Sequence, residues 1–296
     1  MRLKTTLDQW LTLSEVEAAG SIQAAAKSLN KSHTTLLYTV RKLEEQLGLT
    51  LLEVKGRKSV LTTAGKALLR RSRSMLEQAH ALENSSALLA ENVEAEIIVG
   101  IDHLCDRSWL YAPLATFIAE NSVTSVRVIE TSLSKTEQMV KAELTDLSII
   151  NIPVTNAGAE AFGSVSMVPI VSAHHPIAEY ESVTLSELAA LQQIVVTDLG
   201  ACETHDVGWL KSSQRITVDT FDHAWDAVIS GVGYCRFPEH MLARYANDAF
   251  HRLLVEGANK YQVPLHLTLP KGEKTGPAAR RLYALLSESV NRRDNL

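Results

Sequence analysis

Cysteine and long apolar runs are scarce in this sequence, and each absence excludes a class of protein. Three cysteines occur in 296 residues. Their odd number and wide spacing argue against a disulfide-stapled secreted domain and favour reduced thiols in a cytoplasm. No run of about 18 apolar residues occurs, so we expect no membrane-spanning helix. The first ten residues lack the apolar core of a signal peptide. We therefore expect a cytoplasmic protein.

Signatures of catalysis and of cofactor binding are also missing. The sequence contains no P-loop, no GxGxxG loop and no zinc-binding helix motif. His103-x-Cys105 and Cys202-x-x-His205 come nearest to soft metal-ligand pairs, and neither spacing is a recognised zinc signature. We expect neither enzymatic activity nor a resident cofactor or metal. An enzyme or a solute receptor on the fold of the C-terminal part stays open as an alternative.

Charge is distributed unevenly along the chain. Residues 1–80 hold 13 Lys and Arg against 7 Asp and Glu, a net charge of +6. Residues 81–296 hold 16 against 27, a net charge of -11. A basic module followed by an acidic body predicts that only the N-terminal part approaches nucleic-acid phosphates. The length and the 46% apolar content indicate a globular chain of two or three domains.

Two helical patterns follow each other closely near the N-terminus, after a first expected helix at residues 7–19. Apolar side chains recur at the spacing of one helical face over residues 22–29 and again over residues 36–47. Ser21 and Ser32 precede the two runs, where an N-cap hydroxyl is expected. The break between the runs is short, and alanines on the first helix allow the second to cross it closely. This pattern predicts a helix-turn-helix.

A hairpin and a long helix are expected next. Residues 51–54 and 59–62 are compatible with β-structure and flank a basic glycine turn, which predicts a wing that can lie against DNA. From Thr63 to about residue 92 no proline occurs, and Leu or Met recurs every seventh residue from Leu61 to Leu89. That repeat predicts a helix that pairs with a copy of itself. The alternative is an amphipathic helix packed on its own domain.

Strand and helix patterns alternate after residue 93. Near-continuous apolar strands separated by helices predict a mostly parallel α/β sheet covered on both faces. The expected strands are residues 97–101, 126–131, 147–152, 165–171, 194–197, 216–218, 232–237 and 265–269. The expected helices are residues 109–120, 135–144, 185–191, 221–230, 239–246 and 277–291.

The order of these elements and several short motifs resemble the LysR-type transcriptional regulators. The matching segments are AAxxL at residues 25–29 with Ser32, RKLExxLGxxLL at 41–52, LTxAG at 61–65, DLSI at 146–149, HPIA at 175–178 and GVG at 231–233 with Pro238. Their order and spacing make the resemblance specific.

The resemblance implies a multidomain α+β chain. It implies a winged helix-turn-helix at residues 1–62, a dimerising linker helix at 63–92 and a two-lobed α/β effector domain, similar to periplasmic binding proteins, at 93–296. Lobe I would comprise about 93–164 and 265–296, and lobe II about 165–264. The implied function is sequence-specific regulation of transcription on double-stranded promoter DNA, modulated by a small-molecule effector bound between the lobes. Such regulators are homodimers or homotetramers, and RNA polymerase stays open as a further partner.

The second helix of the pair supplies most candidate DNA-binding residues. His33, Thr34 and Tyr38 fall in the half of a recognition helix that reaches base edges. Basic residues further along this helix and in the wing suit phosphates. The predicted set is Ser21, Gln23, Ser32, His33, Thr34, Tyr38, Arg41, Lys42, Arg57 and Lys58.

Several positions depart from the pattern usual in this family. Relatives commonly begin the recognition helix with Gln-Pro, where this chain has His33 and Thr34, and the turn carries Lys31 in place of an apolar residue. Val54 replaces a wing arginine. We expect the fold to be kept and the base preference to differ. An alternative for Tyr38 is packing against the first helix, and Leu37 is expected to fill a gap between helix and wing.

Candidate effector-binding residues follow the strands of the second part. In a two-lobed α/β receptor, ligands bind at the carboxyl ends of the strands, between the lobes. The loop residues expected there are Asp102, His103, Thr131, Ser132, Asn151, His174, Thr197 and Asp198. Relatives often carry Ser or Thr where this chain has Asp102. A carboxylate would repel an anion, which favours an effector with a donor or cationic group. Alternatively, Asp102 caps the helix that starts near Arg107.

The position of Cys202 indicates a second mode of regulation, through a reactive thiol. It lies where the peroxide-sensing branch of this family carries a reactive cysteine. That branch needs a resolving cysteine shortly afterwards, and the next cysteine here is Cys235. A buried, inert thiol is favoured, and a thiol-switched regulator stays open as the alternative to a ligand-switched one.

Overall fold

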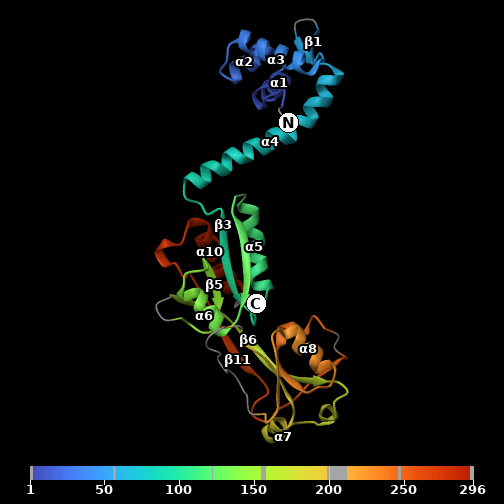
Figure 1. Cartoon of the computed structure of the whole chain (residues 1–296), viewed down its shortest axis with the longest axis vertical. Helices are drawn as coiled ribbons and strands as arrows, with labels where there is room; N and C mark the ends of the chain where they lie inside the picture. The colour runs from blue at the N-terminus through green and yellow to red at the C-terminus, as the bar shows by residue number, and fades with distance from the viewer. Residues whose placement is uncertain are drawn as a thin grey trace. The chain divides into compact units, whose positions relative to one another are not determined.

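The structure is a computed structural model that describes residues 3–55, 58–121, 123–154, 158–198, 200, 212–245 and 248–293. Its contacts divide the chain into two compact units, Met1–Ala90 and Glu91–Leu296 (Figure 1). Within the described ranges, no helix is both long and apolar enough to cross a membrane. Each unit is described by itself.

The first unit is helical with one β-hairpin. Its elements are α1 (Leu7–Ala19), α2 (Ile22–Ser28), α3 (His33–Leu47), β1 (Leu52–Lys55), β2 (Lys58–Leu61) and α4 (Thr63–Ala90). Both expected N-caps are confirmed, because the Ser21 hydroxyl accepts from the amide of Ala24 and the Ser32 hydroxyl from that of Thr35, each at 3.1 Å. Gly20 and Gly48 end α1 and α3 in the left-handed conformation, which glycine adopts at little cost.

Two residues of the sequence motifs join α3, the hairpin and α4. A carboxylate oxygen of Glu44 accepts from the amides of Leu51 and Leu52, at 2.6 and 3.0 Å. A β-carbon on Gly65 would lie 2.3 Å from the carbonyl oxygen of Leu51, so only glycine allows α4 to start this close to the hairpin. The family motif therefore has a structural role at both positions.

The described residues of the second unit form a nine-stranded sheet in the order β4-β3-β5-β11-β6-β9-β7-β8, with β10 paired to β6. Its strands are β3 (Glu96–Asp102), β4 (Ser125–Thr131), β5 (Leu147–Ile150), β6 (Ala159–Ser172), β7 (Gln193–Val196), β8 (Arg215–Val218), β9 (Tyr234–Pro238), β10 (Phe250–Arg252) and β11 (Tyr261–Thr268). The eight expected strands are confirmed with shifted ends. The three-residue β10 was missed because so short a segment shows no periodicity.

The sheet is mixed, so the prediction of a mostly parallel sheet was wrong. β3 runs parallel to β4 and β5, and β7 runs parallel to β8 and β9. Between these groups, β6 and β11 are antiparallel to each other, and each is antiparallel to its other neighbours. A run of apolar residues indicates a buried strand but carries no information on its direction.

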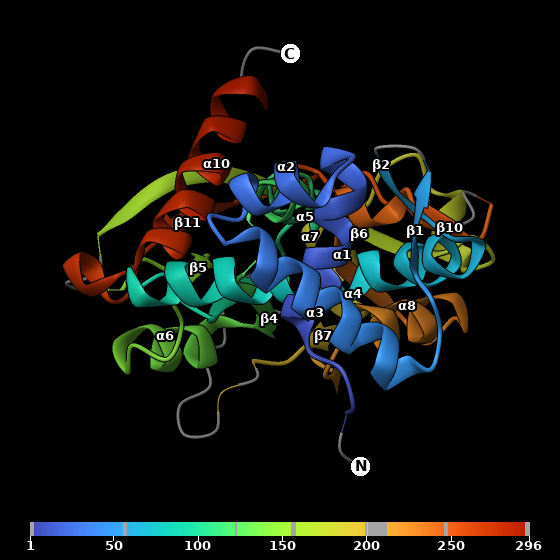
Figure 2. The same cartoon turned by 90° about the horizontal axis from the view of Figure 1, so that it is seen from above.

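Helices cover both faces of the sheet. They are α5 (Ser108–Glu120), α6 (Leu133–Lys141), α7 (Leu185–Ala190), α8 (Phe221–Ile229), α9 (Glu239–Leu242) and α10 (Pro277–Arg293), with short 3-10 helices at Pro176–Glu179 and Gly272–Lys274. On β5, Ile149 belongs to the core that includes α5 and α10, whereas Ile150 packs with Val140 of α6. Figure 2 accordingly shows α10 and α6 on opposite sides of β5.

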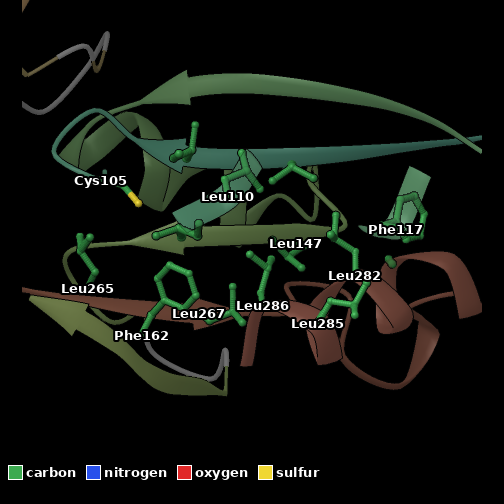
Figure 3. Close-up of a cluster of buried hydrophobic side chains, with 14 of the residues drawn as sticks. Cys105, Leu110, Phe117, Leu147, Phe162, Leu265, Leu267, Leu282, Leu285 and Leu286 are labelled. Atoms are coloured by element: carbon green, nitrogen blue, oxygen red, sulfur yellow. The ribbon is translucent and has the colours of Figure 1, made fainter. Parts of the chain in front are cut away.

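Separate hydrophobic cores define two lobes. Lobe I contains the cluster of Figure 3, in which Phe117, Leu147 and Leu282 lie between strands, α5 and α10. Lobe II contains two further clusters, one around Phe237 and one around Tyr234. The long strand β6 begins beside β11 in lobe I and ends beside β9 and β10 in lobe II. The two lobes are therefore joined by continuous strands.

Candidate nucleic-acid interface and effector pocket

α3 has one buried face and one exposed face. Leu36, Val40 and Leu43 are buried. Leu36 packs with α1 and α2, and Leu43 packs with α1, the hairpin and α4. The exposed residues of α3 are His33, Thr34, Thr35, Tyr38, Arg41, Lys42 and Glu45. A helix held in this way presents a fixed polar surface to a partner.

Tyr38 belongs to the exposed face and not to the core. Its side chain is 65% exposed, which excludes the alternative of packing against α1. The ammonium group of Lys42 lies 5.9 Å from the centre of the Tyr38 ring, at the outer limit of a cation–π contact. The hydroxyl groups of Thr34 and Ser32 form a hydrogen bond with each other at 2.9 Å. The base-contacting candidates therefore lie together at the N-terminal half of α3.

The remaining DNA-binding candidates differ from these residues in their exposure and in their hydrogen bonds. Ser21 is half-buried and caps α2, and Gln23 is exposed as the second residue of that helix. Lys31, which occupies an apolar position of the family pattern, pairs with the carboxylate of Asp8 at 2.5 Å. Arg57 lies outside the described residues, and of Lys58 only the backbone, in β2, is described.

The residues of the seven-residue repeat differ in burial along the chain. Leu61, which ends β2, belongs to the core of the first unit, and Leu68 of α4 is partly buried against that core. Beyond them, Met75, Leu82 and Leu89 are exposed, Leu82 by 73%. The second half of α4 thus carries an apolar stripe that this unit does not bury.

The carboxyl ends of three parallel strands bring most effector candidates to one edge of lobe I. Asp102 ends β3, Thr131 ends β4 and Asn151 follows β5, and all three are buried. The His103 amide donates to the Thr131 carbonyl at 2.9 Å. From lobe II, Thr197 and Asp198 follow β7, and the Ser132 hydroxyl donates to the Asp198 carboxylate at 3.2 Å. Residues of the two lobes are therefore in contact at this edge.

His174 lies elsewhere, and its expected place in this group was wrong. β6 runs antiparallel to β9, whereas β7 runs parallel to β9. The carboxyl end of β6 therefore points to the opposite edge of lobe II from that of β7. His174 is exposed two residues beyond this end. The error follows from the assumption that all strands are parallel.

Asp102 is 1% exposed, and it does not cap α5, which was the alternative to an effector contact. Its Oδ1 accepts from the amide of Leu104 at 2.9 Å, while Asp106 accepts from the amide of Ser108 at the start of α5. Burial raises the pKa of Asp102 to about 7, and the charges of Glu130 and Asp198 act in the same direction. Burial lowers the pKa of the neighbouring His103 to about 4.

A pocket of about 360 Å³ lies between the lobes next to this edge. Lobe I supplies His103, Arg107 and Glu130, and lobe II supplies Asp219, Thr220, Phe221, Asp222, Met241, Arg244 and Tyr245. Of the predicted effector residues, only His103 lines it. The sequence analysis missed the pocket residues of lobe II, although they follow the carboxyl ends of β8 and β9. The rule used for β7 would have included these two strand ends.

The pocket combines aromatic faces with charges of both signs. The rings of His103 and Phe221 meet edge to face with centroids 5.2 Å apart, so the lobes are in contact at this point. Arg107 pairs with Glu130 at 2.8 Å, and the Tyr245 hydroxyl donates to Asp222 at 2.7 Å. Such a site suits a small ligand with an apolar body and a few polar groups.

The described cysteines are structural. Cys105 and Cys235 are buried, and burial raises the pKa of the Cys235 thiol to about 12, so Cys235 is unreactive. Cys202 and His205 lie outside the described residues. Within the described ranges, no group of three or more His, Cys, Asp or Glu side chains is arranged to hold a metal ion.

Both units match families of known proteins. Residues 7–66 match the family described as bacterial regulatory helix-turn-helix protein, lysR family, and residues 90–291 match the LysR substrate binding domain. The uncharacterized HTH-type transcriptional regulator YeeY of Escherichia coli K12 is 29% identical over 252 residues, which are 83% of this chain and 82% of that protein. The RuBisCO operon transcriptional regulator of Allochromatium vinosum is 27% identical over 193 residues, 63% of this chain and 62% of that protein.

Solved structures share the fold. The crystal structure of CbnR, a LysR family transcriptional regulator, has a TM-score of 0.52 at 20% identity and covers 95% of this chain and 100% of its own. A full-length OxyR variant from Pseudomonas aeruginosa has a TM-score of 0.51 at 17% identity, with coverage of 97% and 99%. The chain belongs to the LysR family of transcriptional regulators, in which a DNA-binding helix-turn-helix is followed by an effector-binding domain.

Proposed function

We propose that this chain recognises a specific sequence in double-stranded promoter DNA through α3, and that a small-molecule effector bound between its two lobes modulates this recognition. The division of α3 into two faces carries the proposal. Leu36, Val40 and Leu43 hold the helix by its buried face, and the opposite face is free to enter a major groove. The net charge of +6 over residues 1–80 favours approach to phosphates.

The DNA-binding candidates divide by their place on this surface. His33, Thr34 and Tyr38 are proposed to contact base edges, since a hydroxyl or imidazole can donate or accept and the Thr34 methyl can touch a thymine methyl. Contacts to the sugar-phosphate backbone, which give affinity without sequence preference, are proposed for Ser21, Gln23, Ser32, Arg41, Lys42, Arg57 and Lys58.

We further propose that two copies pair through α4. The exposed apolar stripe of Met75, Leu82 and Leu89 has the seven-residue spacing of a coiled coil. Two paired chains would place two recognition helices on half-sites about one helical turn apart. A tetramer would be a dimer of such pairs. Because the proposed target is chromosomal DNA, we infer that the protein is cytoplasmic and that it alters the access of RNA polymerase to the promoter.

The pocket between the lobes is proposed as the effector site. Its carboxylates, Glu130, Asp219 and Asp222, outnumber its two guanidinium groups, and Asp102 adds a buried carboxyl group beside it. We therefore favour an effector that brings a hydrogen-bond donor or a cationic nitrogen. The predicted residues Thr131, Ser132, Asn151, Thr197 and Asp198 would act from behind the pocket by holding the two lobes at this edge.

Selection of genomic DNA fragments by the purified protein tests the proposal. The wild type is expected to enrich one motif with two-fold symmetry. A double variant, Arg41→Glu with Lys42→Glu, is expected to lose the enrichment. Lys260→Glu makes the same kind of charge change at an exposed position of the second unit and is expected to keep it. A flat enrichment profile for the wild type in low salt would overturn the proposal.

A further inference from the structure

The carboxylate of Asp198 occupies the N-terminus of a helix in the other lobe. Asp198 follows β7 of lobe II, and α6 of lobe I begins at Leu133. Both carboxylate oxygens lie 3.2 Å from the amide nitrogen of Ser134. The Ser132 hydroxyl and the Gly200 amide each donate to Oδ1 at 3.2 Å. A side chain from lobe II thus receives hydrogen bonds from the first turn of a lobe I helix.

This arrangement has the features of an anion-binding site that is already filled. Asp198 is 8% exposed, and a carboxylate withdrawn from water to this extent needs charge-assisted hydrogen bonds in compensation. The amides at a helix N-terminus, together with the helix dipole, supply them. The α6 helix has nine residues, so its dipole is developed over more than two turns.

Nearby groups leave no place for a second anion. The Asp102 carboxyl group, which ends β3, is buried and interacts with the Leu133 amide of the same helix turn. Asp102 Oδ2 and the Ser134 hydroxyl are buried without a hydrogen-bond partner among the described residues. Glu130 adds a further negative charge one residue before the end of β4. An incoming carboxylate would meet repulsion from the Asp198 carboxylate unless that side chain moved away, whereas the charge of Glu130 is paired with Arg107.

We propose that Asp198 is a built-in anionic ligand of the α6 N-terminus, which ties lobe II to lobe I without a bound effector and excludes carboxylate-bearing molecules from this position. The tie itself is independent of DNA binding. Its consequence for effector choice rests on the proposed function, because it assumes that the effector enters the pocket next to this position.

The proposal makes Asp198 a determinant of specificity. Removal of its side chain would leave the hydroxyl of Ser132 and the amide of Ser134 without their acceptor, beside a space the size of a small carboxylate. An acid such as acetate should then bind there and restore the tie. The wild-type protein should not respond, because its own carboxylate already accepts these hydrogen bonds.

Chemical rescue by acetate tests this directly. Hydrogen–deuterium exchange of the peptide that contains Ser134 is measured for the full-length protein in sodium acetate and in sodium chloride of equal ionic strength, without DNA. For Asp198→Ala, exchange at the first turn of α6 is expected to rise at least about tenfold in chloride, as expected for the loss of charged hydrogen bonds. Acetate is expected to reverse this rise in a saturable manner.

Two further variants serve as controls. Asp222→Ala removes an exposed carboxylate from the same pocket and is expected to show no specific acetate response. Asp198→Asn keeps the side-chain volume but removes the charge. Acetate is therefore excluded, and hydrogen exchange at the first turn of α6 is expected to stay raised in both salts. If Asp198→Ala does not fold, Asp198→Asn still tests the tie, since unchanged exchange at Ser134 in this variant would overturn the proposal. An equal acetate response in the wild type and in Asp198→Ala would also overturn it.

Discussion

A β-carbon on Gly276 would lie 2.2 Å from the carboxyl carbon of Glu94. The Glu94 carboxylate accepts from the amides of Ala278 and Ala279, at 3.0 and 3.2 Å, and so caps the first turn of α10. Glu94 comes four residues after the end of α4. The place where the chain enters the second unit is therefore tied to the C-terminal helix of lobe I, and only glycine at 276 leaves room for this contact.

Gly276→Ala is accordingly expected to destabilise the second unit by about 1–3 kcal/mol, because either the carboxylate or the start of α10 must move. Urea unfolding followed by circular dichroism measures the change. Gly158→Ala is the matched control, since a β-carbon at Gly158 would meet no atom within 4 Å. An equal loss in both variants would show that displacement of the Glu94 cap is not responsible, because Gly→Ala at an unobstructed position should by itself stabilise the protein slightly.

Thr34→Ala is expected to reduce discrimination between the operator and altered operators by about 1–3 kcal/mol at the base pair that Thr34 contacts. The hydroxyl and methyl of Thr34 are exposed at the first turn of α3, where base edges are reached. Titrations of operator and point-substituted duplexes measure the effect. The same fractional loss on every duplex would argue against a base contact.

Lys42→Ala is expected to weaken binding about uniformly across sequences and to lower the slope of log K against log salt by about 1, because one phosphate contact is lost. We expect the same of Arg57→Ala in the wing. Fluorescence anisotropy over a range of salt concentrations measures the slope. If operator and random DNA lost affinity to different extents, these residues would be specificity contacts instead.

Leu82→Glu is expected to convert the pair into single chains, since it places like charges opposite each other in the apolar stripe of α4. Sedimentation velocity measures the change in mass. Asn84→Glu adds the same charge two residues further along, off the heptad positions, and should leave the pair intact. A wild-type protein that sediments as a single chain at micromolar concentration would contradict the proposed pairing.

Asp102→Asn is expected to change how stability depends on pH. The folded pKa of Asp102, about 7, lies above the unfolded value of 3.8, so the folded protein holds the proton more tightly between these values. Its contribution to stability is full below pH 4 and is lost as pH rises through 7. Relative to the wild type, Asp102→Asn should therefore gain stability between pH 4 and pH 7, measured by urea unfolding.

His103→Gln should change the pH dependence in the opposite direction. Burial lowers the pKa of His103 from 6.5 to about 4, so its contribution is full above pH 6.5 and is lost as pH falls through 4. Relative to the wild type, the variant should gain stability as pH falls from 6.5 to 4. Parallel pH profiles for the two variants would contradict the assigned pKa shifts.

The first unit could be predicted closely because its signals are local. The caps at Ser21 and Ser32, the glycine that ends α3 and the apolar spacing of α3 all act within a few residues. The same pattern identified the exposed face of the recognition helix. It could not predict that Lys31 would pair with Asp8, 23 residues away, because a charged residue in a turn is compatible with many partners.

In the second unit, periodicity and apolar runs were sufficient to place each longer strand and helix, since the apolar side chains that bury a segment belong to that segment. The direction of β6, and with it the place of His174, was decided only when β11 and β9 paired with it. The contact of Asp198 with Ser132, 66 residues apart in the chain, likewise depends on how two lobes meet. Sequence by itself determined the elements and the exposed face of α3. The tertiary structure alone decided which side chains converge between the lobes, because that depends on strand direction and on contacts distant along the chain.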